Sequence, residues 1–226
     1  MDITLYYTEQ GSGTPLILLH GNGEDGSYFV HQIEYFKDRY RVIALDTRGH
    51  GQSPRGEKPF TIRQFAEDLH DFMDEKGIKK AHILGFSDGG NIALTFALDH
   101  PERVDRLILN GANLDPSGVK LSVQIPIVLG YGLAAALAPL SPKAGRRAEL
   151  LRLMVREPRI RPSELGSIAA PTLVIAGTHD MIREKHTRLI AQSLSNARLE
   201  IIPGDHFIAR TNPEGFCRAV EAFLLA

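Results

Sequence analysis

Hydrophobic and polar positions alternate in two different patterns along most of this chain. Short apolar runs predict β-strands at residues 3–8, 15–20, 40–45, 81–86, 104–110, 171–177 and 197–202. Longer segments with helical periodicity lie between these runs, near residues 27–37, 61–76, 89–99, 183–194 and 213–225. A chain in which strands and helices take turns builds an α/β domain, so we expect a mostly parallel central sheet of about seven strands flanked by helices.

The alternation of strands and helices breaks between residues 112 and 168. Within this break, residues 121–140 form a nearly uncharged run of about the length that spans a bilayer. Glycines and a proline interrupt the run, and strand-helix units of the soluble kind flank it on both sides. We therefore expect no stable membrane insertion and interpret the run as an apolar lid over the mouth of the domain.

A basic segment follows the apolar run. Residues 143–161 hold seven Lys or Arg against two Glu, a composition typical of a solvated helix face. The whole break then forms one small cap insertion, residues 112–168, with an apolar half and a basic half. The remaining residues, 1–111 and 169–226, form the α/β core domain.

The overall composition excludes several classes of partner. A net charge of −1, with 23% charged residues, carries no global signature of nucleic-acid binding. The single cysteine, Cys217, excludes an internal disulfide and a cysteine-cluster metal site, and its apolar surroundings predict a buried small residue. The N-terminal residues carry no export signal, so we expect a cytoplasmic protein. Nothing in the sequence indicates an oligomeric state.

The stretch HILGFSDGGNIAL, residues 82–94, contains the strongest candidate for a catalytic group. An apolar strand runs into Gly-Phe-Ser-Asp-Gly and a helical pattern starts at once, which is the context in which G-x-S-x-G presents a nucleophile. We expect Ser87 on a sharp, strained turn at the helix N-terminus, with Gly85 and Gly89 where side chains would collide with that turn. The alternative, a serine in an ordinary helix cap, would not require glycines on both sides.

Two loops late in the chain offer partners for Ser87. GTHD, residues 177–180, and GDHF, residues 204–207, both follow predicted strands, and open α/β sheets carry their sites at the carboxyl ends of the strands. A serine hydroxyl needs a base to remove its proton. We take His206 as that base and Asp180 as the carboxylate that holds it, an order along the chain that matches one known fold class.

Each partner has a rival in the same loop. His179 is the nearest rival base, but its position at the end of a strand suits an acid partner better. Asp205 is a rival acid, although adjacent residues cannot easily form the side-chain hydrogen bond that His206 needs. The other histidines show no metal-ligand spacing with a carboxylate on one helix, so we predict no metal.

Together these motifs resemble the α/β-hydrolase fold family, in particular its esterases, C–C hydrolases and aminopeptidases. The resemblance covers nearly the whole chain and includes LLHGNG, the D-x-R-G-H-G-x-S stretch from Asp46 to Ser53, GFSDGG, PTLVIAGTHD and GDHF. It implies this fold and a Ser-His-Asp triad, without indicating a substrate. The chain departs from the family pattern in two ways: the usual opening strand is missing, and the insertion is shorter than the common four-helix cap.

A glycine-rich loop near the N-terminus has two interpretations. In PLILLHGNGEDGSYF, residues 15–29, three glycines spell G-x-G-x-x-G after a strand, and Asp46 ends the next apolar run about 20 residues on, as in dinucleotide-binding proteins. Acidic Glu24 and Asp25 in the same loop would repel the pyrophosphate that such a loop should cradle. The charge pattern therefore argues against a dinucleotide, and we expect no cofactor.

The family resemblance gives the glycine loop a different role. It implies that the backbone N–H groups of Asn22 and Asp88 form an oxyanion hole, and that the glycines beside Asn22 let the chain turn tightly. It also implies that Asp46 belongs to a structural turn beside the site rather than to a ribose-binding site.

A triad of this kind supports an acyl-enzyme mechanism, and we expect small carboxylic esters as substrates. Three alternatives remain. A C–C hydrolase or enol-lactonase would use the same triad with a cap arginine such as Arg146, Arg147 or Arg152. An aminopeptidase or amino-ester hydrolase would need a carboxylate near the nucleophile, for which Asp88 is a candidate unless its side chain caps the helix. The third is a catalytically silent ligand-binding receptor, against which the complete set of motifs argues.

Overall fold

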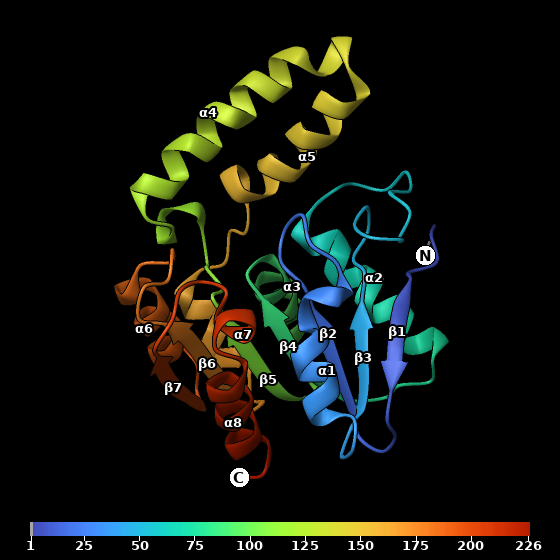
Figure 1. Cartoon of the computed structure of the whole chain (residues 1–226), viewed down its shortest axis with the longest axis vertical. Helices are drawn as coiled ribbons and strands as arrows, with labels where there is room; N and C mark the ends of the chain where they lie inside the picture. The colour runs from blue at the N-terminus through green and yellow to red at the C-terminus, as the bar shows by residue number, and fades with distance from the viewer. Residues whose placement is uncertain (1) are drawn as a thin grey trace.

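A seven-stranded sheet forms the centre of the computed structural model, which describes residues 2–226 (Figure 1). The strands are β1 (Tyr7–Gln10), β2 (Pro15–Leu19), β3 (Arg41–Leu45), β4 (Ala81–Phe86), β5 (Val104–Asn110), β6 (Thr172–Gly177) and β7 (Ala197–Ile202). Their order is β1-β3-β2-β4-β5-β6-β7, with β1 antiparallel to β3 and every other neighbouring pair parallel. The predicted fold class is therefore confirmed.

Helices cover both faces of the sheet. On one face lie α1 (Val30–Phe36), α7 (Ile208–Thr211) and α8 (Pro213–Leu224), and on the other lie α2 (Ile62–Glu75), α3 (Asp88–Asp99) and α6 (Glu184–Ser193). Figure 1 shows α1 and α8 in front of the sheet and α2 and α3 behind it. Because these helices bury apolar stripes against the strands, the sheet is shielded from water on both sides.

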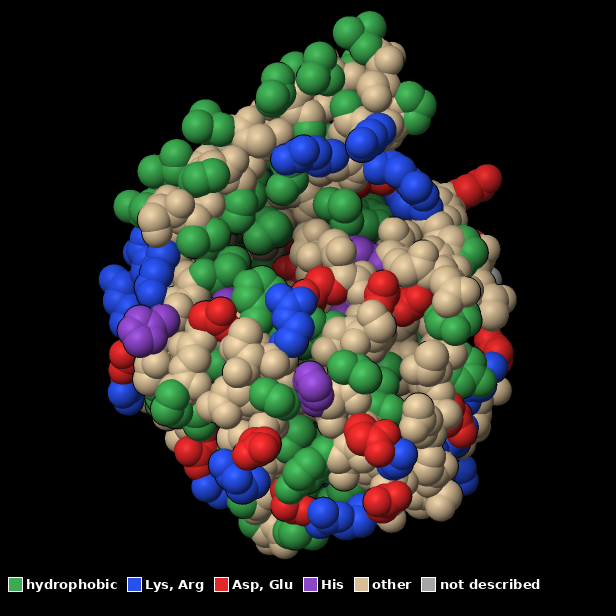
Figure 2. Space-filling model, in the orientation of Figure 1, with side chains coloured by type: hydrophobic (Ala, Val, Ile, Leu, Met, Phe, Trp, Pro, Cys, Tyr) green, Lys and Arg blue, Asp and Glu red, His purple; other side chains and the backbone are tan. Residues whose placement is uncertain are grey.

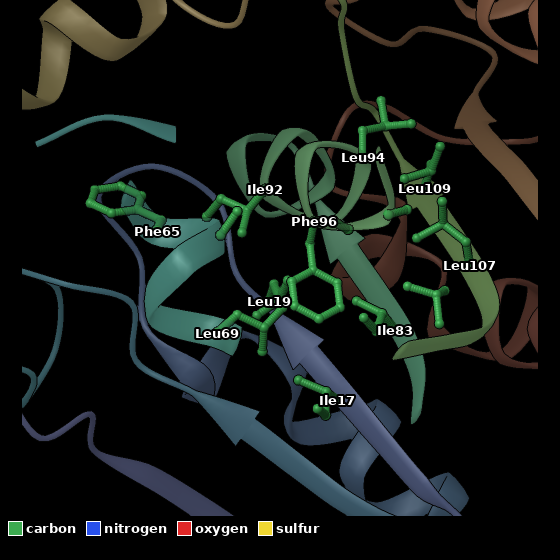
Figure 3. Close-up of a cluster of buried hydrophobic side chains, with 14 of the residues drawn as sticks. Ile17, Leu19, Phe65, Leu69, Ile83, Ile92, Leu94, Phe96, Leu107 and Leu109 are labelled. Atoms are coloured by element: carbon green, nitrogen blue, oxygen red, sulfur yellow. The ribbon is translucent and has the colours of Figure 1, made fainter. Parts of the chain in front are cut away.

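Side chains alternate along each strand between two hydrophobic clusters. In β2, Leu16 and Leu18 join the cluster beneath α1 and α8, whereas Ile17 and Leu19 join the cluster beneath α2 and α3. Figure 3 shows this second cluster, with Phe96 of α3 lying against the strands. Continuous apolar runs are typical of strands that are buried on both faces, which explains why the sequence pattern identified them.

The predicted elements differ from the observed ones in two places. The first strand, predicted at residues 3–8, lies at residues 7–10. Its pairing with β3 reaches back to Tyr6, whose carbonyl accepts a hydrogen bond from Asp46 N, while Asp2 pairs through its side chain with Arg48. The helix predicted at residues 27–37 is divided into a 3₁₀ turn, η1 (Gly26–Phe29), and α1. Cys217 is buried, as predicted.

A helical hairpin projects from the carboxyl edge of the sheet. It consists of α4 (Leu121–Leu137), the short 3₁₀ turn η4 (Ala138–Leu140) and α5 (Pro142–Arg156) (Figure 1). The ends of the predicted insertion pack differently, since Leu114 and Ile168 belong to the core cluster. The projecting part is thus the hairpin alone, and the division at residues 112 and 168 stays a prediction.

Residues 121–140 lie on the hairpin at the carboxyl edge of the sheet, where the lid was predicted, but α4 itself packs little against the core domain (Figure 1). Ala134 is the one buried residue of α4, which contacts α5 at small residues such as Gly130, close to Leu151. It is α5 that reaches the core, because its Leu153 is buried in the core cluster while its basic residues face solvent. The predicted solvated basic face is therefore confirmed.

The apolar segment remains unusual in its surroundings. Residues Leu121–Leu140 are long and apolar enough to cross a membrane by length and composition, and 6% of their most apolar stretch is buried. The core helix of a soluble protein would be mostly covered, so burial in this fold does not explain the composition of α4.

Candidate active site

The turn between β4 and α3 has the backbone expected for a presented nucleophile. Ser87 has φ 54° and ψ −119°, the one positive φ at a non-glycine residue among residues 2–226. Its N–H donates to Asn110 O on β5 at 2.8 Å, which fixes the turn against the neighbouring strand. A residue other than glycine holds such a conformation only where the surrounding structure enforces it. The turn therefore projects the Ser87 side chain at the N-terminus of α3.

Two glycines allow this turn, each for its own reason. A Cβ added at Gly85 would lie 2.2 Å from Gly89 O, across the turn, as the sequence predicted. A Cβ added at Gly89 would instead lie 2.0 Å from Leu19 O, at the end of β2. Gly89 is thus required by the approach of α3 to the strand next to β4, a reason that the sequence alone did not indicate.

The structure brings Ser87, His206 and Asp180 into one hydrogen-bonded chain. His206 Nε2 lies 3.0 Å from Ser87 Oγ, and His206 Nδ1 lies 2.7 Å from Asp180 Oδ1. His206 and Asp180 are each only 4% exposed. Asp180 Oδ1 also accepts from Ile182 N at 2.8 Å. The carboxylate is therefore fixed on its own loop while it orients the imidazole ring.

The rival residues lie apart from this chain. The His179 ring is exposed and its Nδ1 lies 3.0 Å from Thr178 Oγ1. Asp205 Oδ1 accepts from Phe207 N at 2.9 Å and from Thr211 Oγ1 at 3.1 Å, so this carboxylate organises the start of α7. Neither side chain contacts Ser87 within the described part of the chain.

Gly111, directly after β5, is a site residue that the sequence analysis missed. It has φ +62°, and a Cβ added there would lie 2.6 Å from His206 Cε1. Any side chain at this position would displace the imidazole ring. A glycine that follows a strand is a common turn signal, so no local pattern could have assigned it to His206, which lies far along the chain.

The loop that contains Asn22 lies beside the start of α3. The backbone N–H groups of Asn22 and Asp88 donate no hydrogen bond to any residue within 2–226, so both are free to bind a substrate oxygen. His20 fixes this loop: its Nδ1 lies 2.7 Å from Gly21 O, and its Nε2 accepts from Thr47 N at 3.0 Å. Burial lowers the pKa of His20 to about 3, so the ring is neutral.

A buried polar network connects the loop, the turn and the hairpin. Asn22 Nδ2 donates to Asp88 Oδ2 at 2.8 Å and to Leu150 O of α5 at 2.9 Å. Asn91 Nδ2 lies 3.3 Å from Asp88 Oδ1 and 3.1 Å from Asn113 Oδ1. The sequence left two roles open for Asp88, binding of a substrate ammonium group or capping of α3. This network matches neither role directly, because the Asp88 oxygens accept from side-chain amides rather than from the free N–H groups of α3.

Burial raises the pKa of the Asp88 carboxyl to about 6, although the amides of Asn22 and Asn91 act in the opposite direction by hydrogen bonding to the ionised form. The carboxyl is 8% exposed. The Asp88 carboxyl, which lies beside the backbone N–H group of the same residue, therefore titrates near neutral pH. In its ionised form its negative charge would repel an oxyanion that approaches this N–H group.

The acidic residue that the dinucleotide interpretation would assign to a ribose makes other hydrogen bonds in the structure. Asp46 Oδ1 accepts from Gly26 N and Oδ2 accepts from Gln52 N, both at 2.8 Å, so each oxygen already serves the turn that contains it. Burial raises the pKa of the Glu24 carboxyl in the glycine loop. Within residues 2–226, no group of three or more His, Cys, Asp or Glu side chains is arranged to hold a metal ion.

Comparison with known proteins gives consistent matches along most of the chain. A model of the α/β hydrolase fold family matches residues 14–151. The chain is 31% identical over 240 residues to a protein described as a carbamate hydrolase, RutD, from Caulobacter sp. (strain K31), covering 92% of this chain and 90% of that protein. It is 27% identical over 255 residues to 3-oxoadipate enol-lactonase 2 from Acinetobacter baylyi, covering 99% and 94%. The crystal structure of a hydrolase from Pseudomonas aeruginosa PA01 superposes with a TM-score of 0.79 at 25% identity, covering 100% of this chain and 99% of that one.

The close approach of α3 to β2 predicts a large effect of Gly89→Ala. The added methyl group would meet backbone atoms, which cannot rotate away, so we expect the variant to lose roughly 3 kcal/mol of unfolding free energy or not to fold. Gly132→Ala in α4 is the matched control, because its Cβ meets nothing within 4 Å. Urea unfolding should show the control to be as stable as the wild type, and equal stability of the two variants would contradict the packing argument.

The raised pKa of Asp88 predicts a specific dependence of stability on pH. Its folded pKa of about 6 exceeds the ordinary value of 3.8, so its stabilising contribution is complete below about pH 4 and is lost as the pH rises through 6. Asp88→Asn cannot ionise. Between pH 4 and pH 7.5, the unfolding free energy of the wild type should therefore fall by about 2 kcal/mol more than that of the variant. Parallel curves for the two proteins in urea unfolding would show that Asp88 does not titrate in this range.

Proposed function

Because the chain belongs to the α/β hydrolase fold family, we propose that it is a serine hydrolase that cleaves small carboxylic esters through an acyl-enzyme intermediate. The observation that carries this proposal is the continuous hydrogen-bonded chain from Ser87 Oγ through the His206 ring to Asp180. A serine on a strained turn, paired with a buried and oriented imidazole, is the arrangement that acyl transfer requires.

The first half of the reaction forms the acyl-enzyme. Ser87 Oγ attacks the acyl carbon while His206 Nε2 accepts its proton, and Asp180 stabilises the resulting imidazolium and fixes its tautomer. The alcohol then leaves with the proton returned by His206. Two aromatic rings pack against the His206 ring: the Phe86 and Phe207 centroids lie 4.9 Å and 5.4 Å from its centroid, and Phe86 in turn stacks on Tyr28 at 4.5 Å.

The oxyanion is bound by the two free backbone N–H groups, those of Asn22 and Asp88. The hydrogen bonds that His20 makes hold the Asn22 loop before the substrate arrives, so little reorganisation is needed in the transition state. In the second half of the reaction, water replaces the alcohol and His206 again acts as the base. The partner of the protein is thus a small-molecule substrate, and no cofactor takes part.

Cleavage of a carbamate or an enol-lactone is the second candidate. Both bonds present an acyl carbon to the same triad, and the similarity to proteins with these names over most of the chain favours them. A carboxylated substrate of a lactonase or C–C hydrolase would need a nearby cation. Arg147 lines a groove at the far end of the hairpin, and Arg152 lines a cleft of about 990 Å³ to which Ser87 does not contribute. Turnover of p-nitrophenyl esters, carbamates and enol-lactones side by side separates these possibilities.

The remaining alternatives receive less support from the geometry. An aminopeptidase would bind an ammonium group at Asp88, but Asn22 and Asn91 already donate to its two oxygens. A silent receptor would have no need for a histidine held between a buried carboxylate and a serine hydroxyl. Aminoacyl-naphthylamide turnover tests the first alternative, and covalent labelling tests the second.

Ser87→Ala tests the nucleophile directly. We expect the wild type to react with a fluorophosphonate probe and to hydrolyse p-nitrophenyl butyrate, and the variant to do neither, because no other hydroxyl is held by His206. Thermal unfolding should remain nearly unchanged, since the substitution removes a single half-buried oxygen. Residual hydrolysis above a tenth of the wild-type rate would exclude Ser87 as the nucleophile.

Asp180→Asn and Asp205→Asn test the choice of acid. The first removes the carboxylate that orients His206 and should lower kcat by about 10⁴. The second disturbs the start of α7 and should change kcat by less than about tenfold, as expected for a residue outside the reacting groups. Steady-state kinetics of both variants would reject the assignment if Asp205→Asn had the larger effect.

A further inference from the structure

The outer surface of α4 is exposed to an unusual degree for so apolar a helix. Leu121, Ile125, Leu129, Leu133 and Leu137 recur every four residues, so they form one stripe along the helix. Leu129 is 69% exposed and Leu133 is 64% exposed. Leu140, in η4, extends the stripe and is 82% exposed. We call these six residues the apolar stripe, and Figure 2 shows hydrophobic side chains along the outer edge of the hairpin.

An apolar stripe of this length needs a partner. Contiguous apolar patches on soluble monomers are small unless they bind something. Neither the core nor α5 covers the stripe, because each of its six residues is at least 44% exposed. Because the stripe is exposed, polar residues at these positions would lower the stability of the fold little. The apolar composition of the stripe therefore points to contact with an apolar surface outside the described fold.

Positive charge borders the stripe. No charged residue lies between Lys120 and Lys143, and then Lys143, Arg146 and Arg147 follow on the first turns of α5. These three cations are exposed, and no carboxylate lies within ion-pair distance of them in the described part of the chain. The acidic residue of α5, Glu149, pairs with Arg55 of the core domain at 2.6 Å instead. The free end of the hairpin is therefore positive, although the net charge of the whole chain is −1.

A groove at the free end combines the two properties. It has a volume of about 360 Å³, and Leu133, Leu137 and Leu140 line it together with Lys143 and Arg147. An apolar floor with a cationic rim fits a molecule that has hydrocarbon chains and an anionic head. Lipids with phosphate or carboxylate head groups have this chemistry.

We propose that the hairpin of α4 and α5 docks on the surface of a bilayer that contains anionic phospholipid. The apolar stripe lies among the upper acyl chains, roughly parallel to the surface, and Lys143, Arg146 and Arg147 bind the head groups. Binding of this kind combines buried apolar area with attraction to negative charge. It does not depend on the hydrolase activity proposed above.

Peripheral docking fits better than a helix that spans the bilayer. Both ends of the hairpin are tied to the folded core: Lys120 N donates to Met181 O at 2.9 Å, and Leu150 O accepts from Asn22 at 2.9 Å. Crossing the membrane would break these contacts and would draw the cations of α5 into hydrocarbon. This agrees with the expectation of no stable insertion.

A second copy of the chain is the competing occupant of the stripe. A parallel pairing of two stripes would bring two sets of Lys143, Arg146 and Arg147 together, and the described residues supply no carboxylate at the hairpin end to neutralise them. An antiparallel pairing would set each cationic end near Lys120 of the other copy, which is also a cation. An anionic surface meets the same cations with opposite charge. Charge complementarity therefore favours lipid over self-association.

Docking also has a consequence for the catalytic site. The backbone of α5 binds Asn22, whose N–H belongs to the proposed oxyanion hole, so the membrane-bound hairpin and the site are joined by a single hydrogen bond. A substrate dissolved in the interface would reach Ser87 from the side on which the hairpin stands (Figure 1). The surface beneath the hairpin is hollowed on the face that Figure 2 shows.

The test is flotation of the full chain with phosphatidylcholine vesicles that contain either no anionic lipid or about one third phosphatidylglycerol. We expect binding to the anionic vesicles and at least fivefold weaker binding to the neutral ones. Lys143→Gln with Arg147→Gln should weaken anionic binding by about fivefold per charge. Leu129→Gln with Leu133→Gln should weaken it by about tenfold or more. High salt should release the protein, and so should alkaline carbonate.

Matched controls come from exposed residues elsewhere on the chain. Leu225→Gln, at a leucine that is 67% exposed, and Lys185→Gln should bind like the wild type. Because the chain has no tryptophan, Leu129→Trp adds a single reporter whose emission should shift to the blue on anionic vesicles and not in buffer. Thermal unfolding and fluorophosphonate labelling of every variant establish that the fold and the Ser87 site are unchanged.

Several outcomes would overturn the proposal. No binding to either kind of vesicle by a folded protein would remove lipid as the occupant. Equal binding to neutral and anionic vesicles would overturn the role given to the cations and to anionic head groups. Resistance to carbonate extraction would indicate a spanning helix. A dimer in sedimentation velocity that dissociates on Leu129→Gln with Leu133→Gln, without vesicle binding by the wild type, would assign the stripe to a second copy.

Discussion

The packing of α3 against the ends of β2 and β4 is the constraint on which the rest of the site depends. Carbonyl groups at Leu19 and Gly89 lie where the Cβ atoms of larger residues at positions 89 and 85 would be. This close approach holds Ser87 in a conformation that a non-glycine residue rarely adopts. It also brings the N–H group of Asp88 next to the Asn22 loop. The proposed nucleophile and the proposed oxyanion hole thus both depend on one contact between helix and strand.

Buried polar groups then couple this turn to the parts that meet the substrate. Asp88 binds the side chains of Asn22 and Asn91, and Asn22 in turn binds the backbone of α5. Such a network fixes the position of the Asn22 loop relative to the hairpin through polar contacts, so no apolar side chain is needed there. Because burial raises the pKa of Asp88 to about 6, the charge beside the proposed oxyanion hole changes with pH in the range around that value. The same group therefore affects both the stability of the fold and the electrostatics of the site.

The hairpin shows how a short insertion serves two surfaces. Its inner helix, α5, contributes Leu153 to the core and a carbonyl to Asn22, so it belongs to the structure of the site. Its outer helix, α4, contributes almost nothing to the core and presents an apolar stripe bordered by cations. A larger cap would have covered that stripe with further helices. In this chain the described fold leaves the stripe uncovered, and the positive charge at the hairpin end fits the proposed anionic partner.

The sequence by itself determined the sheet, its flanking helices and the identity of the three residues in the Ser87 chain. Apolar runs identify buried strands. The glycines around Ser87 mark a sharp turn through a local motif, and His206 and Asp180 can be found because each lies on a loop that follows a strand. The first strand was misplaced because the apolar run at residues 3–8 does not show where its antiparallel pairing with β3 begins, and that pairing covers residues 7–10. Gly111, the Asn22–Asp88–Asn91 network and the exposed side of α4 were decided only by the tertiary structure. Each of these features depends on contacts between residues that are distant in the sequence. The hydrophobic pattern of a segment such as α4 indicates that it needs an apolar neighbour, but it does not indicate whether the rest of the fold provides that neighbour.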